Sequence, residues 1–229
     1  KQNKMKITFY GHSSLGIEVG GKRILVDPYI SANPNASHIN INELEADYIL
    51  LTHAHGDHVV DVEYIASRCN AVIVSNFEVA THYGNKGFKN HPLNHGGSWV
   101  FDFGKVKYVN AVHSSSFPDG SYGGNPGGFV IEGEHKNIYI SGDTALTMDM
   151  KLIPMRTKLD LAILPIGGNF TMDVEDAIVA SDFVECDKIL GVHFDTFGYI
   201  VINHEESIRK FFDKGKDLML LKIGESIEL

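Results

Sequence analysis

Cysteine is scarce in this chain, with only Cys69 and Cys186 among 229 residues. Two cysteines so far apart cannot form the framework of bridges that stabilises small secreted domains, and neither stands in a metal-binding spacing. We therefore expect both to be buried core residues. This usage fits a reducing compartment and favours a cytoplasmic location.

Long apolar runs are also missing. No segment approaches the roughly 20 apolar residues that a membrane-spanning helix needs, and no run of signal-peptide length precedes the first expected strand. We therefore expect neither export nor a membrane partner.

Basic residues are fewer than acidic ones, with 20 Lys and Arg against 29 Asp and Glu, so the net charge is −9. A chain of this charge repels phosphate backbones, and we expect no nucleic-acid partner. A bound metal pair can still attract a small anion locally, so a small-molecule substrate of either charge stays open. The sequence also leaves open whether the chain forms a homo-oligomer.

What the chain does contain is an ordinary globular composition, with 43% hydrophobic and 21% charged residues. Short β-branched or aromatic runs predict strands over 7–10, 15–19, 22–26, 48–51, 71–75, 99–103, 105–112, 128–132, 137–141, 161–165, 188–192 and 218–221. Helical spacing predicts helices over 59–68, 77–83, 174–184 and 204–214, the third capped by Asp173. Hairpins mixed with strand–helix units predict an α/β fold with two mixed sheets and helices outside. Since no linker is visible, we expect one domain over residues 1–229.

The most informative segment is His53-Ala54-His55-Gly56-Asp57-His58, which directly follows the apolar strand at 48–51. Imidazole nitrogens and carboxylate oxygens suit borderline metals such as zinc. Four buried polar side chains in six residues would each need a partner. A polar surface loop is the alternative, but the spacing and the strand-end position favour a metal site.

One such run supplies too few ligands for a complete centre, and further candidates stand at other strand ends. His113 and His193 directly follow predicted strands, and Asp143 follows another in Ser141-Gly142-Asp143-Thr144. Each alone is more typical of a structural polar residue. Together they form a series that is consistent with one metal-binding edge.

This order of residues resembles the metallo-β-lactamase superfamily over essentially the whole chain. It is most similar to the branch of short, uncharacterised metal-dependent hydrolases related to L-ascorbate-6-phosphate lactonase. Matching flanks include Gly11-His12-Ser13-Ser14, Asp27-Pro28, Gly167-Gly168-Asn169-Phe170 and His193-Phe194-Asp195-Thr196.

The resemblance implies a four-layer αββα sandwich with the site at one edge of the two sheets. It implies that His53, His55 and His113 hold one metal, that Asp57, His58 and His193 hold a second, and that Asp143 bridges both. The cofactors would be two divalent ions, with zinc as the first choice and manganese, nickel or iron as alternatives. Such a pair generates hydroxide near neutral pH, and Asp57 would orient it and accept its proton.

Three further residues carry weaker expectations. His12 could point into the cleft and bind a substrate oxyanion, or it could be bonded within its own turn. Asp27 could fix the tautomer of a metal-binding histidine, or simply form an Asp-Pro turn. Asn169 could reach the cleft, or be a loop residue with backbone hydrogen bonds.

The favoured function is a hydrolase that cleaves a small-molecule lactone, ester or phosphate ester. The alternatives are a phosphodiesterase or nuclease of the same superfamily, a metal-binding sensor without turnover, and a structural metal domain. An open cavity over the metals would favour the enzyme, whereas closed coordination would favour a structural role.

Overall fold

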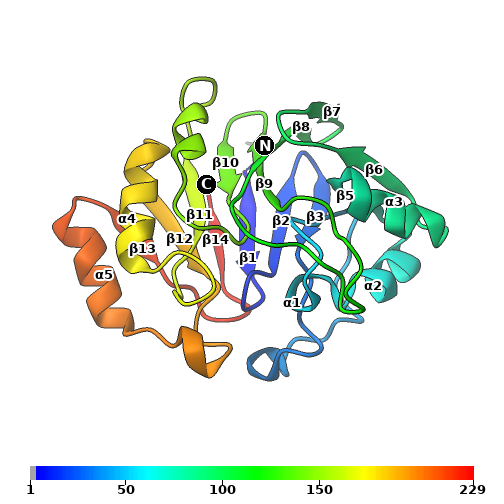
Figure 1. Ribbon diagram of the computed structural model, residues 1–229, viewed down its shortest axis with the longest axis horizontal. Coiled ribbons are helices and arrows are strands. Elements are labelled where there is room, and N and C mark those ends of the chain that lie inside the picture. The colour runs from blue at the N-terminus through cyan, green and yellow to red at the C-terminus, as the bar shows by residue number, and fades with distance from the viewer. Residues whose placement is uncertain (1–3) are drawn as a thin grey trace.

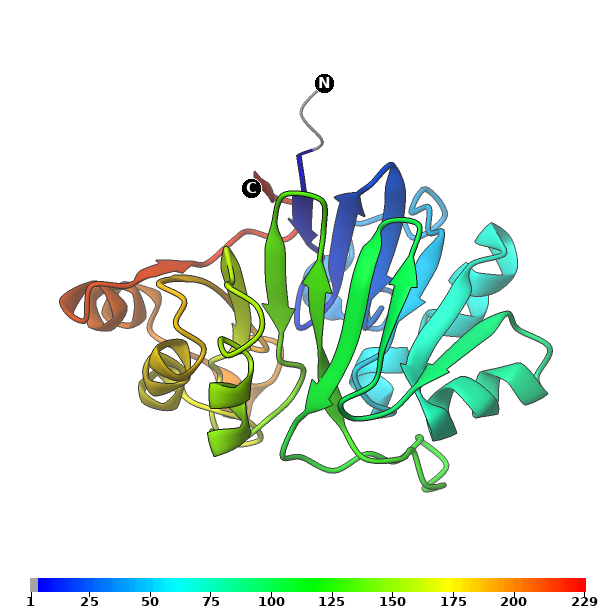
Figure 2. The same cartoon turned by 90° about the horizontal axis from the view of Figure 1, so that it is seen from above.

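Two seven-stranded sheets pack face to face with helices on both outer sides, in the computed structural model of residues 4–229. Figure 1 and Figure 2 show the helices α1 to α3 beside one sheet and α4 and α5 beside the other. This arrangement confirms the predicted αββα sandwich. Residues 1–3 of the expected 1–229 domain lie outside the described residues.

The first sheet has the spatial order β14-β1-β2-β3-β4-β5-β6. Its strands, in chain order, are Lys6–Phe9, Leu15–Val19, Lys22–Val26, Tyr48–Leu50, Val72–Asn76, Asn90–Leu93 and Ser226–Glu228. Pairing is antiparallel from β14 to β3 and parallel from β3 to β6. The opening meander predicted over the first three strands is therefore confirmed.

The second sheet has the order β13-β12-β11-β10-β9-β8-β7. Its strands, in chain order from β7, are Ser98–Phe101, Gly104–Asn110, Gly127–Glu132, Asn137–Ile140, Leu161–Pro165, Lys188–Val192 and Asp217–Met219. Here too one half is antiparallel, from β7 to β10, and the other half is parallel. Both sheets are thus mixed, as the combination of hairpins and strand–helix units predicts.

The helices are short. They are α1 to α5 at Gly56–Val59, Val62–Cys69, Phe77–Asn85, Val174–Phe183 and His204–Asp213, with 3-10 turns at Pro34–Ala36, Met148–Leu152 (η2) and Gly198–Ile200. Asp173 caps α4 by accepting from the Asp176 amide, as predicted. None of the helices in the part of the chain that the structure describes combines the length and the apolar character that a bilayer crossing requires.

Two predictions about elements were wrong in detail. The single helix expected over 59–68 is two helices, because Asp61 stands between them with a non-helical backbone and its carboxylate accepts from the amides of Ile30 and Ser31. The strands β6 and β14 were not predicted. β6 contains Pro92, which breaks a strand pattern but is tolerated at a sheet edge, and β6 is an edge strand.

The core lies between the sheets, where apolar side chains of both form one buried cluster that includes Ile7, Ile24, Phe129 and Ile138. Tyr108 on β8 belongs to this cluster and is completely buried. Its hydroxyl donates to the backbone carbonyl of Thr52 at 2.7 Å, directly before the histidine-rich run. The second sheet is therefore hydrogen-bonded to the segment that carries the candidate ligands.

Replacement of Tyr108 by Phe is expected to lower the free energy of unfolding by about 1–2 kcal/mol, because a buried carbonyl partner loses a hydrogen bond. Tyr139 is the matched control, since it is equally buried and its hydroxyl has no hydrogen-bond partner among residues 4–229. Tyr139→Phe should leave stability unchanged or raise it slightly. Urea unfolding followed by circular dichroism measures both, and equal losses in the two variants would contradict this assignment.

Candidate metal centre

The candidate ligands and the residues beside them converge because they follow the carboxyl ends of strands that point in one direction. Ligand sites of α/β sheets form at such edges. The six strands concerned and the residues that follow them are β1 with His12, β3 with Asp27, β4 with His53, β8 with His113, β10 with Asp143 and β12 with His193.

The histidine-rich run changes conformation halfway along. His53 follows the extended β4, His55 stands at the N-cap of α1, and Asp57 and His58 lie inside this short helix. Because the backbone changes from extended to helical, the side chains of this one short segment contribute to two neighbouring groups of ligand atoms.

Three groups of potential ligand atoms result, one of which joins Asp27 to His53 and His58 in a hydrogen-bond network. The other two groups contain the candidate ligands on either side of the site. In the first group, the nitrogens of His53, His55 and His113 all lie within 4.8 Å of one another. In the second group, atoms of His12, Asp57, His58 and His193 lie within the same limit. These groups match the two ligand sets implied by the resemblance, with His12 added to the second.

Asp143 lies between the two groups. Its Oδ2 is 3.6 Å from His113 Nε2 and 3.9 Å from His53 Nε2 on one side. On the other side it is 3.0 Å from His193 Nε2 and 3.2 Å from His58 Nε2. One carboxylate oxygen is thus within reach of both groups, as a bridging ligand would have to be.

Asp27 orients two of the histidines. Its Oδ2 accepts from His58 Nδ1 at 2.9 Å and from the Thr52 hydroxyl at 2.6 Å. Because the Thr52 proton is used in this way, its oxygen accepts from His53 Nδ1 at 3.0 Å. Both rings are thereby assigned the Nδ1–H tautomer, and their Nε2 lone pairs face the site.

A cation fits the first group well. His53 Nε2 and His55 Nδ1 are 3.0 Å apart, while the other nitrogen of His55 is 3.3 Å from the Ser114 hydroxyl. If His55 carries its proton on Nδ1, it donates to His53 Nε2. If it carries the proton on Nε2, toward Ser114, two lone pairs converge on one point, and that tautomer is the one a bound cation would select.

Buried polar atoms without a hydrogen-bond partner indicate that a cation also fits the second group. His58 Nε2 and Asp143 Oδ1 are buried and have no hydrogen-bond partner among residues 4–229. Buried polar atoms without a partner are rare and are typical of sites that bind an ion. The donor set therefore fits divalent metal on both sides of Asp143.

The charges around His58 also favour a cation. Burial lowers the pKa of His58, but the carboxylates of Asp143 and Asp27 outweigh it and hold the pKa well above its usual value. The two carboxylates thus stabilise a positive charge at His58 Nε2, which a metal ion would supply in place of a proton. For Asp143, burial raises the pKa, yet His193 and His58 hold it well below its usual value. His53 shows the opposite balance to His58, since burial and the neighbouring His58 keep its pKa well below the usual range.

His12 is not where the cleft-binding hypothesis placed it. The ring is buried, its Nε2 lies 3.0 Å from Asp57 Oδ2, and its Nδ1 lies 2.9 Å from the Thr196 hydroxyl. Burial lowers the pKa of His12 to about 4, so the ring is neutral and donates from Nε2 to the carboxylate. His12 therefore contacts Asp57 rather than the cavity above it.

Unusual backbone conformations accompany these contacts. His12, Asp27 and His193 all have positive φ, at 55°, 44° and 57°. Such conformations cost about 1–3 kcal/mol each in non-glycine residues and cluster at functional sites. Gly142, next to Asp143, also has positive φ, and a Cβ there would lie 2.8 Å from Thr52 Cβ. Only glycine lets the two sheets approach this closely at the site.

A cavity of about 630 Å³ lies over the two groups. Asp57, His113, Asp143 and His193 face it from below, together with His55. Its outer walls come from Ser114, Phe170, Phe197, Gly198 and Tyr199. The aromatic wall residues Phe170, Phe197 and Tyr199 were not predicted from the sequence, although aromatic side chains in loops after strand ends are a usable signal.

One expectation about the walls needs correction. Asn169 is exposed and is not among the residues that line the cavity; its neighbour Phe170 is. The long loop at 114–127 contributes only Ser114 to the lining, because the rest packs elsewhere, with Phe117 stacked on His82 at 3.9 Å.

Comparison with known proteins agrees with the fold. A family profile described as "Beta-lactamase superfamily domain" matches residues 6–193, a span that contains every candidate ligand. A "UPF0173 metal-dependent hydrolase" of Flavobacterium johnsoniae is 82% identical over 98% of this chain and 100% of its own length. Its counterpart in Methylacidiphilum infernorum is 49% identical over the same shares.

Among solved structures, Igni18, described as a novel metallo hydrolase from the archaeon Ignicoccus hospitalis, superposes with a TM-score of 0.90 and 31% identity. The match covers 99% of this chain and 98% of that one. The residues, the fold and these relatives agree that the chain belongs to the UPF0173 metal-dependent hydrolase family of the metallo-β-lactamase superfamily.

Proposed function

We propose that this chain is a dinuclear metal-dependent hydrolase that cleaves a small, neutral lactone or ester with an apolar group. The observation that carries the proposal is the position of Asp143 Oδ2, between two ligand groups and at the floor of a cavity of about 630 Å³. A purely structural metal domain would have closed coordination instead.

The ligand sets follow from the two groups. His53, His55 and His113 would hold one ion, Asp57, His58 and His193 the other, and Asp143 both. Nitrogen and carboxylate donors suit zinc best, with manganese, nickel or iron as alternatives. Bound ions would lower the pKa of a water and polarise the bond to be cleaved.

Asp57 is the residue that would position the attacking water. Burial raises its pKa, but the hydrogen bond from His12 and the charge of His58 outweigh burial, so the pKa stays below its usual value and the carboxylate remains ionised. Among residues 4–229 its Oδ1 has no hydrogen-bond partner, so it is available as an acceptor. His12 is a positioning residue, because it holds Oδ2 of an aspartate that lines the cavity.

The walls support the substrate class. Phe170, Phe197 and Tyr199 line the cavity, and none of the ten lining residues is Lys or Arg. Phosphate esters and nucleic acids are usually bound with such cations, so the walls favour a neutral substrate with an apolar group. This argues against the phosphodiesterase or nuclease alternative, and the open cavity argues against a sensor without turnover.

Metal binding is the first test. After chelation and reconstitution with zinc, the chain should hold up to two ions, and Asp143→Ala should hold at most one, because the bridging carboxylate is lost. Asp213→Asn, an exposed position in α5, is the matched control and should bind as the parent does. Elemental analysis measures the ratio. No bound metal in the reconstituted parent would overturn the hydrolase proposal.

Turnover is the second test. Asp57→Ala should lower kcat for any cleaved ester at least about 100-fold, the usual contribution of a positioned acid–base group. Circular dichroism should show an unchanged fold, and metal content separates a lost ligand from a lost acceptor. Unchanged turnover in this variant would contradict the role assigned to Asp57.

Substrate class is the third test. On the reconstituted enzyme, aryl and alkyl lactones and esters should be cleaved in preference to phosphomonoesters and phosphodiesters. Phe170→Ala should raise KM for a phenyl ester about tenfold, as expected when an aromatic contact is removed, with kcat little changed. Phe212→Ala, exposed on α5, should have no effect. A preference for phosphate esters would refute the substrate class while leaving the metal centre intact.

A further inference from the structure

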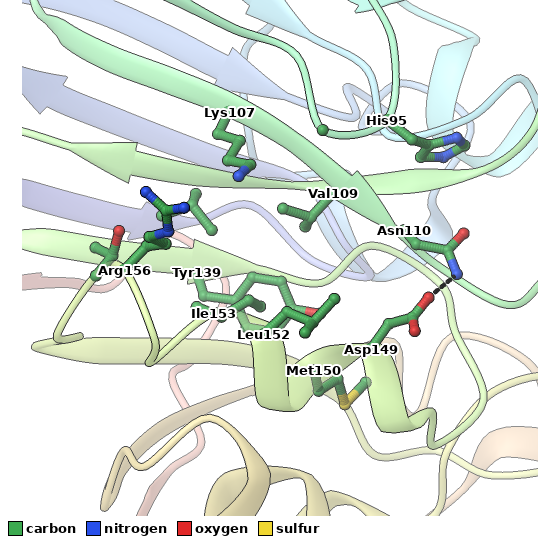
Figure 3. A pocket seen from close by; sticks show the side chains of 13 residues that line it. His95, Lys107, Val109, Asn110, Tyr139, Asp149, Met150, Leu152, Ile153 and Arg156 are labelled. Carbon is green, nitrogen blue, oxygen red and sulfur yellow. Dashed lines mark hydrogen bonds between the residues drawn. The ribbon is translucent and has the colours of Figure 1, made fainter.

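A second cavity, of about 290 Å³, lies on the outer face of the second sheet. Its floor is made by β8, β9 and β10, where Lys107, Val130 and Tyr139 form one row across paired strands. The segment from η2 to Thr157 covers this floor (Figure 3). None of the residues that line it is a candidate metal ligand, so it is distinct from the centre described above.

The two ends of the cavity differ in the charge of the side chains that line them. Figure 3 shows Lys107 and Arg156 together at one end, and His95, Asn110 and Asp149 at the other. Neither Lys107 nor Arg156 forms an ion pair within residues 4–229. At the far end, Asn110 Nδ2 already donates to Asp149 Oδ2 at 2.7 Å. Because Asn110 is a neutral donor, Asp149 keeps its negative charge at the far end. The positive charge of the cavity is therefore confined to the end with Lys107 and Arg156, away from this carboxylate.

The acidic neighbour of the cationic end is already neutralised. Glu132 accepts from the Thr157 hydroxyl at 2.7 Å, and its other oxygen pairs with Lys105 at 3.3 Å. Thr157 lines the cavity, whereas Glu132 does not. Lys107 and Arg156 thus remain available to an anion from outside the chain.

Between the ends the walls are apolar apart from one hydroxyl. Val109, Val130 and Ile153 line the middle beside the Tyr139 ring. Tyr139 is completely buried and its hydroxyl has no hydrogen-bond partner among residues 4–229. Such a group is costly unless it gains an acceptor. In Figure 3 this hydroxyl points away from Arg156, toward the middle of the cavity.

We propose that this cavity binds a small carboxylate with an apolar body and a carbonyl oxygen along it. The carboxylate lies on Lys107 and Arg156, the body lies against Val109 and Ile153, and the carbonyl oxygen accepts from Tyr139. The volume matches the lower end of known small-molecule sites.

The test uses 4-oxo-4-phenylbutanoate as the probe, with its neutral amide and with 4-phenylbutanoate, which lacks the ketone, as matched controls. Isothermal titration on the whole chain should give a Kd of about 1 mM or better for the probe, the range expected for a ligand of this size. The amide should bind at least about tenfold more weakly, as expected when a charge-assisted contact is lost.

Variants locate the binding. Lys107→Gln and Arg156→Gln should each weaken the probe about tenfold, whereas Lys158→Gln, exposed and outside the cavity, should not change it. Tyr139→Phe should weaken the probe and leave 4-phenylbutanoate unchanged. Phe170→Ala should have no effect, which separates this site from the metal centre. Melting curves verify that each variant is folded.

Three results would overturn the proposal. They are the absence of probe binding, equal binding of the amide, and binding that neither cation variant weakens. The last result would place the carboxylate at the metal centre or elsewhere. Self-association of the chain, measured by sedimentation, would also overturn the proposal if Arg156→Gln abolishes it and the probe does not bind. That result would identify the surface as a contact between copies of the chain.

Discussion

The hydrogen bonds around Thr52 are the constraint on which the rest of the site depends. Its carbonyl accepts from Gly127 at 3.1 Å and from Tyr108, both in the second sheet, while its amide and hydroxyl donate to Asp27. One residue therefore joins the two sheets and fixes the ring of the next residue, His53. Because the second sheet is held at this point, its strand ends reach the ligands contributed by the first.

The hydrogen-bonded residues around Thr52 also bring buried charges together, which lowers the stability of the fold. Buried carboxylates face buried imidazoles, and His12, Asp27 and His193 adopt left-handed backbone conformations. A folded protein keeps such an arrangement when function requires it, because each orphaned atom or strained residue lowers stability. An ion bound on either side of Asp143 would satisfy the lone pairs that the fold has collected.

The two cavities illustrate different chemistry on one scaffold. The cavity over the metal centre has aromatic walls and contains no Lys or Arg, so its positive charge would come from metal alone. The cavity on the outer face of the second sheet has Lys107 and Arg156 at one end and, in the middle, the Tyr139 hydroxyl, which has no hydrogen-bond partner among residues 4–229. We propose a neutral ester for the first cavity and a carboxylate for the second, so the two proposals together predict that the chain separates two ligand classes by charge.

The sequence by itself predicted two mixed sheets with helices outside, most strand positions and the ligand candidates, because apolar periodicity and a dense histidine run are local patterns. The four-layer αββα order was implied by the resemblance to the metallo-β-lactamase superfamily. It missed β6, where Pro92 breaks the pattern, and β14, and it left open whether His12 and Asn169 reach the cavity. Only the tertiary structure decided that His12 holds Asp57 and that Phe170 lines the wall. Which way a side chain points depends on backbone torsion and on partners distant in the chain, and neither is encoded in local spacing.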